Sequence, residues 1–149
     1  MKITVLLVED SKFQKLVNER MLQKAGYAVL TASDGEEALS LARQTIPDIV
    51  LLDMLLPKLG GREVMLALRG DAPTKRIPVL FFSSLSQANE AKLMEEGAAG
   101  YFAKARLAEQ PAAGEKELIA LIEKLVRNAQ DRNSPPAKPG KPKAAATAT

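Results

Sequence analysis

The sequence alternates five short apolar runs with longer segments in which apolar residues recur at helical spacing. Runs this short are typical of buried strands, and alternating strands and helices form a parallel sheet with helices on both faces. Of the two common doubly wound strand orders, the five-stranded order 2-1-3-4-5 fits this length. We therefore expect an α/β fold, a doubly wound five-stranded parallel sheet with five helices. Its predicted strands are residues 3–8, 27–31, 49–52, 79–82 and 100–103.

The helical segments carry start signals of their own. Ser11 is suited to cap the first helix, and residues 33–37 contain a capping box for the second. The fourth helix is expected at about 86–96, and the segment 105–115 is expected to be a flexible loop before the fifth. The apolar residues at helical spacing in the five helices are, in order, Phe13, Leu16, Val17 and Met21; Ala38, Leu41 and Ala42; Val64, Met65 and Leu68; Ala91 and Met94; and Leu118, Ile122, Leu125 and Val126.

Polar residues stand where four of the five predicted strands end. Glu9 and Asp10 follow the first strand and Asp53 the third, while Ser83 follows the fourth and Lys104 the fifth. In the order 2-1-3-4-5 the first and third strands are neighbours, and ligands bind at the carboxyl ends of the strands there. We therefore expect three acids, a hydroxyl and a lysine to meet in one site.

Composition narrows the chemistry open to such a site. The chain has neither cysteine nor histidine, which excludes disulfides, thiolate metal sites and histidine-based catalysis. The net charge of +3 comes from residues 131–149, where Arg132 and three lysines outnumber Asp131, so residues 1–130 are neutral. The basic pI is therefore no sign that the domain binds nucleic acid, and we expect no nucleic acid or membrane as its partner.

The C-terminal segment differs in composition from the rest of the chain. From Ser134 onward it consists of small residues, proline and lysine, which cannot bury enough apolar surface to offset the entropy lost on ordering. We therefore expect a folded domain at 1–130 and a disordered tail at 131–149. Since no apolar run could cross a bilayer and the first residues lead directly into a strand, a cytoplasmic location is expected.

Three carboxylates within a few ångströms repel one another unless a cation joins them. Oxygen ligands without histidine or cysteine favour Mg²⁺, and a carboxylate beside Mg²⁺ is a nucleophile toward phosphorus, giving an aspartyl phosphate. Each residue alone also has a simpler explanation: Lys104 as a solvated lysine, Tyr101 as core, Ser83 as a helix cap, and Glu9 and Asp10 as a pair at a helix N-terminus.

These motifs resemble the receiver (CheY-like) domain of two-component response regulators. The resemblance extends from Lys2 to about Asn128. It rests on segments that stand in the expected order and spacing: residues 7–11 (LVEDS), Asp53 with Pro57 and Gly61, Ser83, and residues 97–104 (GAAGYFAK).

The resemblance implies a role for each site residue. Asp53 is the expected phosphoacceptor, with Glu9, Asp10, Asp53 and the backbone carbonyl of Leu55 holding Mg²⁺; Ser83 and Lys104 contact the phosphoryl group, and Tyr101 reports the switch. The implied donor is a sensor histidine kinase or a histidine phosphotransfer protein. The signal is expected to pass by protein–protein contact through the fourth helix, fifth strand and fifth helix, a face that can also form a homodimer. No output domain and no turnover of an external substrate are expected.

Other functions fit the residues less well. A Mg²⁺-dependent phosphatase would need two acids two residues apart on the first strand, whereas Glu9 and Asp10 are adjacent. A flavodoxin-like cofactor binder would have a Ser-, Thr- and Gly-rich loop there, and a receiver-like scaffold without phosphate turnover would most often lack an acid or the lysine. The chain departs from the family pattern at Ala105, where receivers usually have proline, and in the long segment 105–115.

Overall fold

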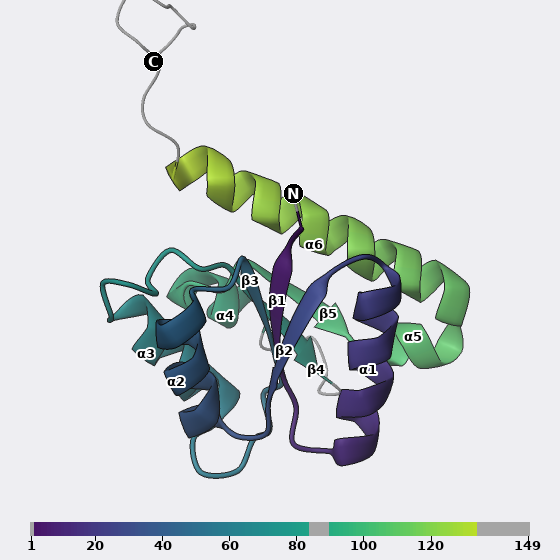
Figure 1. Cartoon of the computed structure of the whole chain (residues 1–149), viewed down its shortest axis with the longest axis horizontal. Helices are drawn as coiled ribbons and strands as arrows, with labels where there is room; N and C mark the ends of the chain where they lie inside the picture. The colour runs from purple at the N-terminus through teal and green to yellow at the C-terminus, as the bar shows by residue number, and fades with distance from the viewer. Residues whose placement is uncertain (1, 84–89, 134–149) are drawn as a thin grey trace, which may run out of the picture.

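The computed structural model describes residues 2–83 and 90–133, and in this part of the chain the strands form one parallel sheet (Figure 1). The strands are β1 (Thr4–Val8), β2 (Ala28–Ala32), β3 (Ile49–Leu52), β4 (Val79–Ser83) and β5 (Gly100–Ala103). Their order, β2-β1-β3-β4-β5, confirms the prediction. The register brings neighbouring strand ends together, because Leu52 of β3 pairs with Val8 of β1 and with Phe81 of β4.

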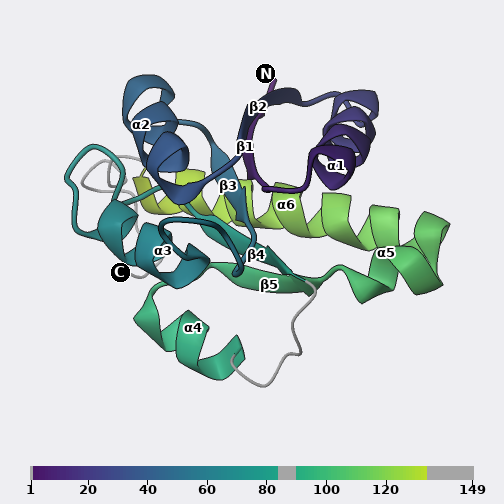
Figure 2. The ribbon, with the colours of Figure 1, turned by 90° about the horizontal axis from the view of Figure 1, so that it is seen from below.

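Helices cover both faces of the sheet. They are α1 (Lys12–Lys24), α2 (Gly35–Thr45), α3 (Gly61–Arg69), α4 (Glu90–Glu96), α5 (Ala105–Glu109) and α6 (Pro111–Asn133). Figure 2 shows α2, α3 and α4 on one face and α1, α5 and α6 on the other. The chain steps from β1 outward to β2 and then back past β1 to β3, β4 and β5. Right-handed crossovers that run in opposite directions place their helices on opposite faces of the sheet.

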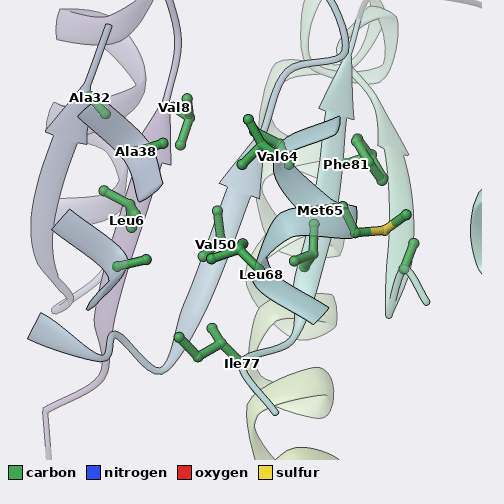
Figure 3. Close-up of a cluster of buried hydrophobic side chains, with 14 of the residues drawn as sticks. Leu6, Val8, Ala32, Ala38, Val50, Val64, Met65, Leu68, Ile77 and Phe81 are labelled. Atoms are coloured by element: carbon green, nitrogen blue, oxygen red, sulfur yellow. The ribbon is translucent and has the colours of Figure 1, made fainter. Parts of the chain in front are cut away.

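Each face of the sheet has its own hydrophobic core. β3 is buried along its whole length, with Val50 and Leu52 facing α2 and α3, and Ile49 and Leu51 facing α1 and α6. Figure 3 shows the first of these cores, where Met65 of α3 lies among the strand side chains. Burial on both faces explains why this strand is an uninterrupted apolar run.

Among the described residues there is a sixth helix that the prediction missed. The segment 105–115, expected to be a flexible loop, forms α5 and the start of α6, so the helix predicted as the fifth is α6. Its alanines and leucine favour helix, and Pro111 suits a first helical turn, where an N–H has no intrahelical partner. Gly114 adds no flexibility: a Cβ there would lie 2.8 Å from the carbonyl oxygen of Arg106, so glycine allows α5 and α6 to pack closely.

The buried face of α1 also differs from the prediction. Its buried residues are Asn18 and Leu22. Phe13 is 76% exposed, and Leu16 and Val17 are exposed as well. Helical spacing identifies an apolar stripe but not what covers it, and part of this stripe borders an open groove between α1 and α5.

The buried face of α4 was predicted wrongly for a related reason. Leu93 is buried, whereas Ala91 and Met94 are exposed. Three apolar residues pointing in different directions around a helix of 7 residues do not identify its buried side. The described helix begins at Glu90, and its predicted start at Ser86 lies outside the described residues.

The C-terminal helix extends past the predicted domain boundary. α6 continues to Asn133, so residues 131–133 of the predicted tail are helical, and the rest of that tail lies outside the described residues. None of the helices within residues 2–83 and 90–133 combines the length and apolar character needed to cross a bilayer.

Candidate functional site

The carboxyl ends of β1, β3, β4 and β5 bring the predicted site residues to one edge of the sheet. Glu9 follows β1, Asp53 follows β3, Ser83 ends β4 and Lys104 follows β5. The backbone ladder fixes their positions, since the amide of Asp53 donates to the carbonyl of Val8 (3.3 Å) and that of Lys104 to Ser83 (2.9 Å). Side chains from four strands therefore meet in one place, as the strand order predicts.

Glu9, Asp10 and Asp53 form an acidic cluster. One carboxylate oxygen from each residue lies within 4.8 Å of the other two. Glu9 and Asp53 are 2% and 7% exposed, whereas Asp10 is exposed to solvent. Buried carboxylates this close need a cation or hydrogen-bond donors, and a site made only of carboxylate oxygens fits Mg²⁺.

Lys104 provides a positive charge inside this cluster. Its Nζ lies 2.5 Å from Glu9 Oε1 and 3.1 Å from Asp53 Oδ2, and its side chain is only 14% exposed. It also donates to Gln14 Oε1 at 2.8 Å. An ammonium group has three N–H donors, so these oxygens satisfy all of them. Lys104 is therefore a partner of the acids and not a solvated lysine at a strand end.

The other oxygen of Asp53 belongs to a second set of hydrogen bonds. Asp53 Oδ1 accepts from the backbone N–H of Leu55 (3.2 Å) and from the buried Ser83 hydroxyl (3.4 Å). The side chains of Ser83 and Tyr101 are hydrogen-bonded, and burial raises the pKa of Tyr101. Asp53 is thus connected through Ser83 to an aromatic side chain on β5. Metal binding by the carbonyl of Leu55 stays a prediction.

The loop after β3 approaches the site very closely at Gly61. A Cβ on Gly61 would lie 2.3 Å from the carbonyl oxygen of Asp53, and the amide of Gly61 donates to the carbonyl of Met54 (3.0 Å). Because glycine has no side chain, α3 begins directly against the strand end that carries Asp53.

The sequence prediction missed two neighbours of Lys104. Gln14 lies in the first turn of α1, shortly after the acid pair, which is the signal that could have placed it here. Phe82 is the residue of β4 before Ser83, and its side chain lies on the opposite face of the strand. Lys104 Nζ lies over its ring, 5.5 Å from the centroid. Both border the groove between α1 and α5, a cavity of about 570 Å³ lined by Phe13, Gln14, Val17, Asn18, Phe82, Lys104, Ala105, Leu107 and Ala108.

Comparisons with known proteins agree with this geometry. The family model of the response regulator receiver domain matches residues 5–110. Protein PilH of Pseudomonas aeruginosa is 36% identical over 101 residues, which cover 67% of this chain and 84% of PilH. The probable transcriptional regulator ycf27 of Guillardia theta is 39% identical over 104 residues; these are 69% of this chain but only 40% of that relative.

A solved structure of a receiver domain has a similar fold. The receiver domain of sensor histidine kinase PA1611 from Pseudomonas aeruginosa PAO1 superposes with a TM-score of 0.73 at 26% identity, over 85% of this chain and 99% of that chain. That structure has a magnesium ion coordinated in its active site cleft. The family match, the relatives and the strand-end cluster agree, and the chain belongs to the response regulator receiver domains of two-component systems.

Proposed function

We propose that Asp53 accepts a phosphoryl group from a sensor histidine kinase or a histidine phosphotransfer protein. The observation that carries this proposal is the setting of its carboxylate. Asp53 is buried at a strand end, 3.1 Å from the Lys104 ammonium, with oxygens of Glu9 and Asp10 within 4.8 Å. A nucleophile held between a cation and a candidate Mg²⁺ site is suited to phosphoryl transfer, which needs mainly positioning and charge neutralisation.

Glu9, Asp10, Asp53 and the backbone carbonyl of Leu55 are the residues that would hold Mg²⁺. When bound, the ion neutralises negative charge on the transferring phosphoryl group. The all-oxygen donor set supports this choice, as does the magnesium ion in the related receiver structure.

The proposed transfer forms one bond and breaks another. A carboxylate oxygen of Asp53 attacks phosphorus, and the bond from phosphorus to the donor's histidine nitrogen breaks, with its electron pair staying on the imidazole. Lys104 pairs with one phosphoryl oxygen, from its present position beside Asp53 Oδ2. Ser83, 3.4 Å from Asp53 Oδ1, donates its hydroxyl to another. The product is an acyl phosphate on Asp53.

The signal then passes from the site to a binding surface. A phosphoryl group on Asp53 draws Ser83 toward it, which changes the partner of Tyr101 and favours a second arrangement of the neighbouring surface. We place this surface on α4, β5 and α6, the last replacing the predicted fifth helix, and it can also serve for homodimerisation. In such a pathway the domain acts in the cytoplasm through protein contacts.

We propose that the phosphodonor approaches Asp53 past α1. The groove between α1 and α5 adjoins Lys104, and the exposed Phe13 lies on its rim. Lys12, Arg20 and Lys24 are exposed on α1. We infer that the donor contacts this groove with an amphipathic helix that carries acidic residues on its flank.

Labelling by a small phosphodonor tests the proposal. The parent protein, incubated with acetyl phosphate and Mg²⁺, should gain one phosphoryl group by mass spectrometry, and Asp53→Asn should gain none. Asp71→Asn, which alters a half-buried acid that pairs with Arg43 outside the site, is the matched control and should label normally. Equal labelling of Asp53→Asn and the parent would refute the assignment.

A further inference from the structure

The backbone of Lys104 leads away from the site. Its peptide bond to Ala105 is trans, and Lys104 itself has helical angles (φ −58°, ψ −28°) from which α5 begins. Lysine carries its charge on a flexible four-carbon stem, so the backbone alone does not determine where the ammonium lies. The position of Nζ therefore depends on the groups that its side chain contacts.

Those contacts are of two kinds. Glu9 and Asp53 are acids of the candidate metal site, so their oxygens would take new partners if a metal ion and a phosphoryl group were bound. The second kind consists of Gln14 and Phe82, which are expected to bind neither the metal ion nor the phosphoryl group. The Gln14 amide oxygen accepts from Nζ at 2.8 Å, and the Phe82 ring lies 5.5 Å from it.

Phe82 is a rigid support for this charge. It is 2% exposed, and its ring packs against Phe102 with the two centroids 6.1 Å apart. A cation over an aromatic face is attracted by the negative side of the ring, more strongly when water is excluded. Gln14 is exposed on α1, so its hydrogen bond competes with water and contributes less.

We infer that Phe82 and Gln14 are positioning residues that keep the Lys104 ammonium at the phosphoryl site while the carboxylates exchange their partners. The inference rests on the proposed function of Asp53. It assigns a role to two residues that are not among the predicted site residues: Phe82 in the core and Gln14 on α1.

Two substitutions remove these contacts at similar volume, Phe82→Leu and Gln14→Met. The maximal rate of labelling by acetyl phosphate in Mg²⁺ should fall about three- to tenfold for Phe82→Leu, which corresponds to a partly desolvated cation–π contact. It should fall about twofold for Gln14→Met, as expected for one exposed hydrogen bond to a charge. The donor concentration at half-maximal rate should change little, and Phe82→Tyr, which keeps the aromatic face, should restore most of the rate.

A double-mutant cycle separates positioning from general damage. In a Lys104→Met background neither substitution should lower the residual rate further, because their effect passes through the ammonium. Phe81→Leu and Gln23→Met are the matched controls: the first removes a buried ring on the opposite face of β4, the second an amide at the far end of α1. Their effects should be the same with and without Lys104. Equal losses for Phe82→Leu with and without Lys104, or no loss in the parent background, would overturn the inference.

A second measurement does not depend on phosphorylation. The Lys104 ammonium should give a ¹⁵N-correlated NMR signal, protected from exchange, in the unphosphorylated parent saturated with Mg²⁺, when the acids would bind the ion. Phe82→Leu should broaden or remove this signal, whereas Phe81→Leu should not. An unchanged signal in Phe82→Leu would refute the positioning role of Phe82, whether or not Asp53 is the phosphoacceptor. If the parent showed the expected NMR change but was not labelled, only the proposed function would be refuted.

Discussion

Gly61→Ala is the substitution that most directly tests how the site is built. The added Cβ would meet the carbonyl oxygen of Asp53 at 2.3 Å and the Cα of Met54 at 2.8 Å. The first contact is about 1 Å inside ordinary van der Waals distance, and both atoms belong to the backbone, which cannot rotate away as a side chain can. Relief requires α3 or the end of β3 to move, and the end of β3 carries Asp53, the proposed phosphoacceptor.

The size of the effect follows from this overlap. Forcing extra volume into a packed region costs about 1–3 kcal/mol, and the better helix propensity of alanine returns at most about 0.5–1 kcal/mol. The expected net loss of stability is about 1–2 kcal/mol. For a domain of this size, each 1 kcal/mol lowers Tm by roughly 3–5 °C, so a decrease of about 3–10 °C is expected.

Gly60→Ala is a closely matched control. At this neighbouring position the added Cβ would meet Glu63 Oε1 at 2.6 Å, the end of a flexible side chain, while the nearest backbone atom, Met54 O, is 3.8 Å away. Thermal unfolding should therefore show the larger loss in Gly61→Ala, and only that variant should label slowly with acetyl phosphate after correction for its folded fraction. If both variants melted and labelled like the parent, the close approach of α3 to Asp53 would not constrain the site.

Three further predictions concern pH, the lifetime of the phosphate and the tail. Burial and the nearby Glu123 carboxylate raise the pKa of Tyr27 from 10.0 to about 12. The stability linked to this shift is complete below pH 10 and is lost as pH rises toward 12. Tm should therefore decrease more steeply over this range in the parent than in Tyr27→Phe; parallel curves would contradict the assignment. Leu55, two residues after Asp53, is 59% exposed and cannot orient a water by hydrogen bonding, so Leu55→Asn should accelerate loss of the phosphate from Asp53. A decay rate that is unchanged or slower would show that Leu55 does not limit hydrolysis. Removal of residues 134–149 should leave Tm and labelling unchanged, because this segment has no bulky apolar residue to join the core; a decrease of several degrees would mean that it docks.

The sequence was sufficient to predict the sheet and the positions of most residues of the candidate site. Asp53 and Lys104 could be placed because each directly follows an apolar run, and the ends of parallel strands fall on one edge once the strand order is known. The buried strands are also the least ambiguous part of such a sequence, since residues 49–52 are apolar on both faces. Residue type and position along the chain therefore identified the acids, the hydroxyl and the lysine.

Packing between distant segments decided what the pattern could not. Helix α1 does have an apolar stripe, but whether Phe13 in that stripe is covered depends on the position of α5. The sequence prediction had assigned the residues of α5 to a loop. Gln14 follows the acid pair and Phe82 ends the predicted fourth strand, but neither position ties the residue to a lysine far away in the sequence. Both meet Lys104 only because α1, β4 and β5 come together. Periodicity records which residues can be buried, whereas their neighbours are determined by the tertiary structure, because a side chain contacts whatever the fold brings within reach.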